Sequence, residues 1–442
     1  MTTEPDVSVA DRLVQVLDHL RIERAHFAGS MLADIAGFAQ TYPERMGWLA
    51  LVCPPRVEPR ALRVLGRRLV IVAGDQGPPA AMARRVMPNL PDATVVWLPG
   101  YFSPPWADVI ADRTAEIETA LLSLTSGDEP QDSKAMPAGG RGAVAGITYE
   151  IGGQGPPLLL LPLGLASSQW DPLLFQLKKR FRTVTLGGPA LGFLAMLESR
   201  GQAASFRAMI QRMIQAVDLR PGELVLEVGC GSGVLDRWLA GYTRHANPII
   251  GCDINRYLLR EATGLAMQEG LADVITFQEG DAEALPFSDS HVDVALSLTV
   301  LEEGNADRML AELVRVTKPG GRVAVMTRAL DIPWVVNVPV GPETKTKVQM
   351  PRGFVGPQGC ADASLYRRLH QAGVTDVQMF PQLAAFDDLQ NAQAQFALGA
   401  ILSALTPEET EEWHAAVAQA LAEGTYFIAQ PFHCAVGTKP EM

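Results

Sequence analysis

The chain has 442 residues, of which 48% are hydrophobic and 19% charged. This length exceeds what one hydrophobic core typically accommodates, so it predicts two domains. Its formal net charge is −12, from 37 Lys and Arg against 49 Asp and Glu. No cluster of basic residues stands out that would neutralise a phosphate backbone, so the composition argues against nucleic acid as a partner.

Cysteine usage and the N-terminal segment predict a cytoplasmic protein. The five cysteines are scattered without C-x-x-C spacing, so we expect neither a disulfide framework nor a metal site. The opening segment, MTTEPDVSVADRL, is acidic and polar, unlike a signal peptide. The longest apolar run, residues 156–165, is about half as long as a membrane span requires. We therefore expect no membrane span, and the sequence leaves homo-oligomer formation open.

The first half of the chain alternates helix-like and strand-like segments around a polar, Gly- and Pro-rich linker at 123–142. Before the linker, the pattern predicts helices at 10–20 and 32–41 and strands at 26–29, 48–53, 69–73 and 94–98. After it, we expect strands at 147–151, 158–161 and 182–186, a helix at 173–179, and a less regular seam at 187–204. Such alternation predicts a mostly parallel sheet covered by helices.

The alternation restarts near residue 206. The expected helices lie at 206–217, 233–240, 257–268 and 307–316, and the expected strands at 224–228, 248–252, 275–279, 292–296 and 322–327. The tail is less regular, with helices expected at 361–372 and 407–422 and a final strand at 429–437. The fold class is therefore α/β, with two doubly wound domains at 1–195 and 205–442.

A glycine-rich turn is the first local signal in the second domain. The segment LVLEVGCGSG is a hydrophobic strand that ends where Gly229, Gly231 and Gly233 alternate. Glycine tolerates positive φ and has no Cβ, so a ligand can lie against the backbone there. The following helix presents free N–H groups at its N-terminus, which favour an anionic group.

Two aspartates follow the next two expected strands. Asp253 comes directly after the strand at 248–252, where its carboxylate can accept both hydrogen bonds of a ribose diol. The alternative for Asp253 is a simple N-cap of the next helix. Asp281 lies in GDAEALPF after the following strand, and an aspartate beside a small residue can receive the exocyclic amine of adenine. The segments DVALSLTVLEE and RVTKPGGR complete the pattern, the latter with a turn between a helix and a strand.

Together, these segments resemble the class I S-adenosylmethionine-dependent methyltransferases of the ubiquinone/menaquinone biosynthesis type, over residues 206–327. The resemblance implies a seven-stranded, doubly wound, Rossmann-like sheet with S-adenosylmethionine as the cofactor. It implies a cofactor site formed by Glu227, Gly229, Cys230, Gly231 and Gly233 at the methionine part, Asp253 at the ribose, Ile254, Asp281 and Ala282 at the adenine, and Ser297 lining the pocket. The competing NAD fingerprint, G-x-G-x-x-G/A, differs from the G-x-G-x-G of this chain.

The acceptor side is less well defined by the sequence. Glu302 and Glu303 follow the fourth strand and are candidates for a general base, or else form a charged first helical turn. Tyr366, His370 and His433 are further candidates, although His433 lies in an apolar run that also suits a core histidine. We expect a substrate-facing insertion at about 330–425, in which residues 331–339 form one wall of the acceptor pocket.

The first domain resembles an α/β-hydrolase whose parts are in exchanged order. Residues 8–120 match the latter part of that fold, whereas 149–162 with Trp170 match its beginning, as in a circular permutation. One composite domain at 1–195 is therefore expected.

The catalytic residues of a hydrolase are absent from this first domain. A nucleophile elbow requires G-x-S-x-G, but Met31 stands at the nucleophile position unless a shifted register brings Ser30 there. Gly77 stands where the acid is expected, and Tyr101 stands in place of the general base. Without an imidazole nothing takes the proton of a serine. We expect a pseudo-hydrolase with a structural role.

The sequence therefore predicts an enzyme that moves a methyl group from S-adenosylmethionine to an O, N, S or C atom of a small-molecule acceptor. The alternative is a catalytically silent cofactor-binding module that acts as a regulatory or scaffold protein.

Overall fold

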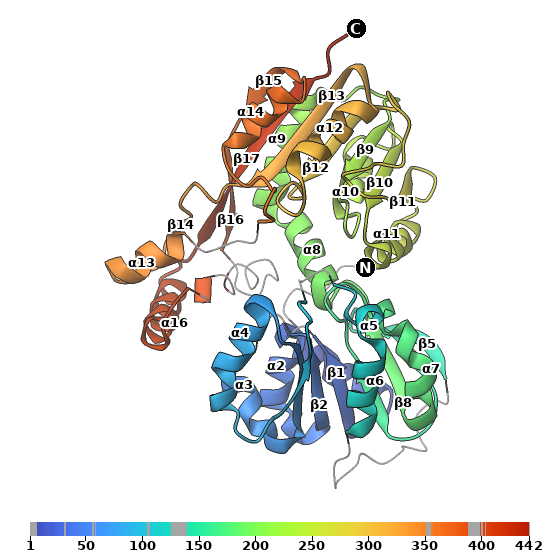
Figure 1. The fold of residues 1–442 in the computed structure, drawn as a ribbon, viewed down its shortest axis with the longest axis vertical. Coiled ribbons are helices and arrows are strands. Elements are labelled where there is room, and N and C mark those ends of the chain that lie inside the picture. Colours follow the sequence, from blue (N-terminus) through green and yellow to red (C-terminus); the bar gives the residue numbers. More distant parts are fainter. Residues whose placement is uncertain are drawn as a thin grey trace. The chain divides into compact units, whose positions relative to one another are not determined.

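A computed structural model describes residues 7–30, 32–54, 57, 59–103, 107–124, 139–350, 355–387, 398, 401–402 and 404–441. Met31 and most of the predicted linker, residues 125–138, lie outside this description. The chain forms two compact units, Met1–Ala195 (unit 1) and Met196–Met442 (unit 2). Figure 1 shows the helices and strands of both units.

Unit 1 is built on a mostly parallel sheet. Its strands are β1 (Ala25–Gly29), β2 (Met46–Val52), β3 (Leu69–Gly74), β4 (Thr94–Leu98), β5 (Gly140–Val144), β6 (Ile147–Gly152), β7 (Pro157–Leu160) and β8 (Arg182–Gly187). Its α-helices are α1 (Val9–His19), α2 (Leu32–Thr41), α3 (Pro59–Leu62), α4 (Gly77–Val86), α5 (Val109–Asp112), α6 (Thr114–Ser123) and α7 (Asp171–Arg180). Helix α8 (Gly192–Gln202) continues from unit 1 into unit 2.

The two ends of unit 1 share one sheet. The strand order is β4-β3-β2-β1-β7-β8-β6-β5, so β1, from before the linker, pairs with β7, from after it. Only β6 runs antiparallel to its neighbours β5 and β8. The strands β1, β2 and β3 are buried along their whole length, because apolar clusters cover both faces of the sheet.

Two predictions about irregular segments in unit 1 are wrong. The end of the expected linker forms β5, because Gly140–Val144 pairs along β6 in a hairpin that local composition does not reveal. The expected seam at 187–204 contains α8. Its buried Glu198 forms an ion pair with Arg237 of unit 2 at 2.6 Å, a tertiary contact that favours helix in an ambiguous segment.

Unit 2 is a second α/β unit. Its strands are β9 (Val225–Val228), β10 (Ile249–Asp253), β11 (Ile275–Glu279), β12 (Val292–Leu298), β13 (Thr317–Arg328), β14 (Val335–Val336), β15 (Thr375–Met379), β16 (Gln382–Phe386) and β17 (Ile428–Thr438). Its helices are α9 (Ala204–Val217), α10 (Val234–Tyr242), α11 (Arg256–Gln268), α12 (Ala306–Val316), α13 (Pro342–Gln349), α14 (Ser364–Gln371) and α16 (Pro407–Ala422).

The sheet of unit 2 has nine strands among the described residues, where the resemblance implies seven. Its order is β11-β10-β9-β12-β13-β17-β14, and β15 and β16 also pair with β17. The strands from β11 to β13 are parallel, and β17 is antiparallel to β13. Because β17 is eleven residues long, its first half extends beyond the end of β13 and pairs with β14 and β16, which adds two strands (Figure 1).

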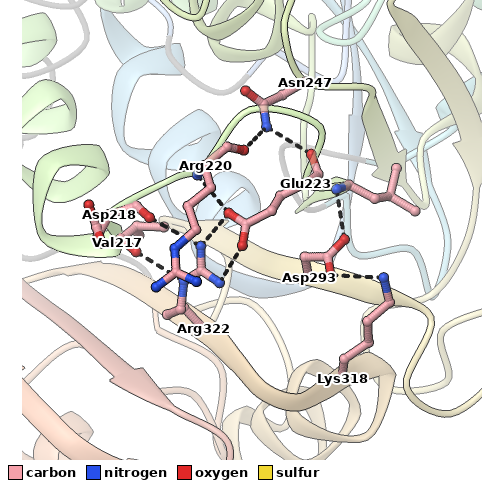
Figure 2. A network of polar contacts seen from close by, with 9 residues as sticks. Val217, Asp218, Arg220, Glu223, Asn247, Asp293, Lys318 and Arg322 are labelled. Carbon is pink, nitrogen blue, oxygen red and sulfur yellow. Dashed lines mark hydrogen bonds and ion pairs between the residues drawn. The ribbon is translucent and has the colours of Figure 1, made fainter.

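A polar network fixes the amino end of the sheet, opposite the glycine turn (Figure 2). Arg322 of β13 donates to Glu223 at 2.9 Å and to the backbone carbonyl of Val217 at 3.0 Å. Asp293 accepts from the Leu224 N–H at 2.9 Å and from Lys318 Nζ at 2.8 Å. These bonds hold the loop between α9 and β9 and so fix where β9 begins.

The Lys-Pro-Gly-Gly segment was expected to be a separate turn before the last parallel strand, and this prediction is wrong. The segment lies inside β13, where the pairing with β12 shifts between Val292 and Val294. The extra residues of β13 do not pair with β12 and form a local irregularity. Pro319 is accommodated there without ending the strand.

Candidate functional site

The carboxyl ends of β9 and β10 meet at the glycine turn. The N–H groups of Gly229 and Cys230 both donate to the carbonyl of Cys252, at 2.7 and 3.1 Å. The N–H of Gly231 donates to Asp253 Oδ2 at 2.8 Å. The turn is therefore held against the end of β10, at the edge where open parallel sheets bind ligands.

Close neighbours and positive φ require the glycines. Gly229 and Gly233 have φ of 79° and 67°. A Cβ at Gly229 would lie 2.1 Å from Val300 Cγ2, and one at Gly233 would lie 2.6 Å from Phe277. Helix α10 begins directly after Gly233, so its free N–H groups are exposed toward the turn.

Asp253 does not cap the following helix, so that alternative is wrong. Asn255 is the N-cap of α11, and its side chain accepts from the N–H groups of Tyr257 and Leu258. Asp253 instead accepts from Gly231 through Oδ2 and from the Asn255 N–H through Oδ1 at 2.8 Å. Burial raises the pKa of this carboxyl against the opposing effect of these bonds. Each of its oxygens retains a second lone pair for a ligand hydroxyl.

The residues expected at the adenine lie beside Asp253. Ile254 is 68% exposed, an unusual position for a large apolar side chain. The Gly280 N–H donates to the Asp253 carbonyl at 3.0 Å, which brings the end of β11 to the same edge. Asp281 is exposed and its Oδ1 accepts from the Glu283 N–H at 2.8 Å, while Ala282 is half-buried.

Two buried carboxyl groups lie behind the turn. Glu227 pairs in register with Gly251 of β10, and a Cβ at Gly251 would lie 2.7 Å from Asp236 Oδ2. Asp236, on the first turn of α10, therefore lies over Gly251 beside Glu227. Burial and the neighbouring carboxyl raise the pKa of Glu227, and burial raises that of Asp236 to about 7. Among the described residues, neither Asp236 oxygen nor Glu227 Oε2 has a hydrogen-bond partner.

A half-buried cation on α8, Arg200, lies close enough to Glu227 to lower the pKa of that carboxyl, and no sequence motif predicted it. Arg200 of α8 donates to Thr299 Oγ1 at 3.4 Å and lies over the Phe206 ring. Burial lowers its pKa to about 10, while Glu302 and Glu227 act in the opposite direction. The ion pair between Glu198 and Arg237 holds α8 in place. No local motif marks Arg200, because it lies in the segment expected to be irregular.

Glu302 and Glu303 are not a first helical turn, since α12 begins only at Ala306. Glu302 is 0% exposed and its Oε1 accepts from the Arg328 N–H at 2.7 Å. Glu303 lies 3.9 Å from Arg328 Nη2, and burial raises its pKa to about 7. Glu302 thus fixes the end of β13, whereas Glu303 is half-buried and near Asp253, which also raises its pKa.

Ser297 is 1% exposed and pairs in register with Val228. Because adjacent residues of a strand alternate, it lies on the opposite face of the sheet from Glu227, which pairs with Leu296. Its contact with the cofactor stays a prediction.

Two of the predicted base candidates meet, and a third residue joins them. Tyr366 Oη lies 2.9 Å from His433 Nδ1, and His433 Nε2 lies 2.8 Å from Asp331 Oδ1. His370 is exposed one turn further along α14. The sequence placed Asp331 only in a pocket wall, since its partner lies 102 residues away.

The hydrolase positions of unit 1 hold no catalytic pair among the described residues. The buried Ser30 hydroxyl donates to the carbonyl of Cys53 at 3.2 Å, and Tyr101 donates to Asp112 at 2.7 Å. His26 lies inside β1, where burial lowers its pKa to about 3 and its Nδ1 accepts from the Trp48 N–H. Gly77, at the expected acid position, has φ of 74° and lies against Phe102.

Residues 226–325 match the family described as methyltransferase domain. The match assigns S-adenosylmethionine as the cofactor of this segment. Similar proteins include a demethylmenaquinone methyltransferase of Thermobifida fusca (strain YX), 39% identical over 119 residues, which are 26% of this chain and 48% of that protein. A 2-phytyl-1,4-naphtoquinone methyltransferase of Synechococcus elongatus is 40% identical over 108 residues, 24% of this chain and 46% of that protein.

A third relative, Methyltransferase GfsG of Streptomyces halstedii, is 32% identical over 118 residues, 26% of this chain and 42% of that protein. The chain thus spans less than half the length of these relatives. In the described part of the chain, no three His, Cys, Asp or Glu residues are grouped to hold a metal ion, and all five cysteines are free thiols. None of the described helices has the length and hydrophobicity to cross a membrane.

Proposed function

We propose that unit 2 is an S-adenosylmethionine-dependent methyltransferase that acts on a small-molecule acceptor. The family match over 226–325 supports the domain type. The observation that carries the proposal is the charge pattern around the glycine turn. Half-buried Arg200 and buried Glu227 are close enough to shift each other's pKa, and Glu227 Oε2 has no hydrogen-bond partner among the described residues.

This pattern fits the methionine part of the cofactor, which carries both a carboxylate and an ammonium group. Arg200 would hold the carboxylate, since a guanidinium forms strong charge-assisted bonds with it. Glu227 would accept from the ammonium, which supplies the missing partner of Oε2. Gly229, Cys230, Gly231 and Gly233 provide the backbone against which this part lies.

The nucleoside part fits the next two strand ends. Asp253 would accept from the ribose diol, and exposed Ile254 would be covered by the adenine. Asp281 and Ala282 would bind the adenine edge. The order of these assignments matches the order of the strands. The ends of β9, β10 and β11 are consecutive along the sheet, as the methionine, ribose and adenine parts are along the cofactor.

The bound cofactor supplies a methyl group that is already activated by its positive sulfur. The chain itself must therefore hold the acceptor in line, exclude water and, for a hydroxyl acceptor, take up a proton. The insertion at 330–425 is proposed to do this. It includes a separate apolar cluster beyond the sheet, with Trp334, Val348 and Trp413 fully or nearly buried.

The acceptor proposed is a quinone-type ring in its reduced form. Two relatives are named for methyl transfer to demethylmenaquinone and to 2-phytyl-1,4-naphtoquinone. Their similarity to this chain covers about a quarter of it.

Calorimetry with S-adenosylmethionine, followed by mass spectrometry of reduced 1,4-naphthoquinone, tests the function. Saturable binding and a product heavier by one CH₂ group are expected. Binding without any product from a panel of hydroxyl, amine, thiol and carbon acceptors favours the silent regulatory module. No binding of the cofactor contradicts both.

Unit 1 is proposed to be a permuted, catalytically silent α/β-hydrolase scaffold. Counted from β5 to β8 and then from β1 to β4, its strands lie in the order 1-2-4-3-5-6-7-8, with only the second antiparallel, which supports the permutation. Tyr101 donating to Asp112, and Ser30 donating to a backbone carbonyl, support the absence of hydrolysis. A structural contribution to the enzyme remains as its role.

A further inference from the structure

A chain of three hydrogen-bonded side chains connects α14, β17 and the segment after β13. Tyr366 Oη lies 2.9 Å from His433 Nδ1, and Asp331 Oδ1 lies 2.8 Å from His433 Nε2. The imidazole is 3% exposed, and the Tyr366 ring meets it edge-on with centroids 5.4 Å apart. Both nitrogens of the imidazole ring therefore form hydrogen bonds, and the phenol of Tyr366 is at one end of the three-residue chain.

The direction of these bonds follows from chemistry. An ionised carboxylate only accepts, so His433 Nε2–H donates to Asp331 and the neutral ring leaves Nδ1 as an acceptor. Tyr366 must then donate its O–H to Nδ1. Burial raises the pKa of Tyr366 to about 12, which keeps the phenol protonated as this donor. The lone pairs of the phenolic oxygen accept no hydrogen bond from the side chains of the described residues.

Asp331 is held ready to balance a positive imidazole. Its Oδ2 accepts from the Ala363 N–H at 3.0 Å. Burial acts to raise the pKa of Asp331, but the bonds from His433 and Ala363 outweigh it and keep the pKa below its ordinary value. An Asp–His pair of this kind orients the imidazole and stabilises the imidazolium when it forms.

The triad lies at the same edge of the sheet as the glycine turn. The Cys360 N–H donates to the Leu301 carbonyl at 2.8 Å, which attaches the segment before α14 to the loop that follows β12. Val300 of that loop lies against Gly229. On the other side, the Leu330 N–H donates to the Ala361 carbonyl at 2.8 Å. Tyr366 therefore starts from a segment tied to the ends of both β12 and β13.

The same face also holds an unused hydroxyl. Thr327 pairs in register with His433, so both side chains lie on one face of the sheet. Thr327 Oγ1 is buried and has no hydrogen-bond partner among the described residues. Buried polar groups without partners are rare, and one beside the triad is consistent with a polar ligand on this face.

We propose that Tyr366 is the catalytic residue that takes a proton from a phenolic hydroxyl of the acceptor, with His433 and Asp331 as the positioning relay behind it. The inference rests on the proposed methyltransferase function and narrows the acceptor to one with an ionisable ring hydroxyl, such as a reduced quinone.

The step balances as follows. The acceptor O–H bond breaks and its proton passes to Tyr366 Oη, while the Tyr366 proton passes to His433 Nδ1, giving an imidazolium beside Asp331. The acceptor's oxygen, or the ring carbon beside the one that carries it, then forms a bond to the methyl carbon. After attack by carbon, the hydrogen on that carbon leaves to solvent as a proton and the ring oxygen takes up a proton, which restores the aromatic hydroxyl. The bond from that carbon to sulfur breaks and its electron pair stays on sulfur. The proton leaves to solvent from the imidazolium after product departs.

The full-length chain, S-adenosylmethionine and anaerobic 1,4-dihydroxynaphthalene test the relay in the wild type, Tyr366→Phe, His433→Gln and Asp331→Asn. Tyr149→Phe is the matched control, because Tyr149 forms a similar pair with His19 Nε2 at 3.0 Å in unit 1. We expect Tyr366→Phe and His433→Gln to lower kcat by about 100-fold or more, with KM and the cofactor Kd within about 2-fold of wild type. Tyr149→Phe should behave as wild type.

Two measurements distinguish proton transfer through Tyr366, His433 and Asp331 from a purely structural role of their hydrogen bonds. Nitrogen NMR of the imidazoles, with the His433 signal assigned by its loss in His433→Gln, should show the Nε2-protonated ring. The groups facing His433 are Asp331 after β13, Tyr366 on α14 and Thr327 on β13, with Cys434 beside it on β17. The second readout is the division between kcat and KM, because loss of the relay lowers kcat, whereas loss of a structural tie also changes KM and cofactor binding.

The outcomes are distinguishable. Wild-type chain that ignores S-adenosylmethionine overturns the proposed function and the relay with it. Wild-type chain that binds the cofactor but leaves the naphthalenediol unmethylated overturns the relay and the reduced-quinone acceptor, and leaves the proposed methyltransferase domain intact. The relay is also overturned if Tyr366→Phe keeps kcat within about 3-fold of wild type, or if its loss of turnover is matched by an equal loss of cofactor binding.

Discussion

The carboxylate of Asp253 accepts a hydrogen bond from the backbone N–H of Gly231 at 2.8 Å, so the end of β10 fixes the shape of the turn that follows β9. One side chain therefore both shapes the glycine turn and faces the proposed ribose position. Removing the Asp253 carboxylate should therefore weaken cofactor binding by more than the loss of its contact with the ribose alone.

Replacing Asp253 by Ala is expected to weaken binding of S-adenosylmethionine by about 100-fold, because a charge-assisted ligand contact and the acceptor of Gly231 are lost together. Calorimetry measures the change. Asp273→Ala is the control, since Asp273 is exposed on the loop before β11. Equal affinities for the two variants would remove Asp253 from the site.

Gly229→Ala should abolish cofactor binding through a clash rather than through backbone strain alone. Its new Cβ would lie 2.1 Å from Val300 Cγ2, at a φ of 79°. Gly222→Ala is the matched control, because Gly222 has φ of 86° with nothing within 4 Å. That control should cost about 1–2 kcal/mol of stability and leave binding intact. Similar effects on binding from both substitutions would contradict the assigned close approach.

Cofactor binding should release protons near neutral pH. The pKa of Glu227 is raised by burial and by Asp236, whose own pKa burial raises to about 7, so the free site is partly protonated at pH 7. An ammonium group favours the ionised form, and affinity should therefore rise as pH increases through this range. Calorimetry in buffers of different ionisation enthalpy measures the release, and Glu227→Gln should reduce it. A pH-independent affinity argues against Glu227 as the partner.

The same raised pKa values make the folded unit 2 less stable at high pH. Groups with a raised folded pKa bind more protons in the folded than in the unfolded state, so their contribution is lost as pH rises through the folded value. Asp236→Asn removes one of the two buried charges and should raise the midpoint of thermal unfolding at pH 8. An unchanged or lower midpoint at pH 8 would show that ionised Asp236 is stabilised by another group.

The network at the amino end of the sheet should give unit 2 an opposite response to acid (Figure 2). Burial acts to raise the pKa of Glu223, but bonds from Arg322 and Arg220 outweigh it and lower the pKa below 4.5. Its stabilisation is present above the unfolded value and lost as pH falls. Glu223→Gln should cost about 1–2 kcal/mol at pH 7 and flatten the acid dependence, measured by urea unfolding. Asp307→Asn, which alters a more exposed pair with Arg368, should change little.

The meeting of the glycine turn and the two aspartates at one sheet edge was predictable because its signals are local. In a parallel sheet, the residues directly after consecutive strands meet at one edge, so the turn of Gly229 to Gly233, Asp253 and Asp281 needed only strand positions. The alternating pattern likewise predicted an α/β fold. The pairing of β1 with β7 joins segments from both sides of the linker in one sheet, which no local pattern marks.

Tertiary structure alone brought in Arg200, Asp236 and Asp331. Arg200 lies on α8, which is attached to α10 by the ion pair between Glu198 and Arg237, 39 residues apart. Asp331 and Tyr366 reach His433 across 102 and 67 residues, through an antiparallel strand that returns beside β13. Sequence patterns report the period of burial within one element, whereas a buried charge finds its partner through the packing of several elements. For that reason the amino-acid sequence determined the strand ends and the glycine turn at which a cofactor is proposed to bind, and only the folded structure decided which buried side chains lie beside them.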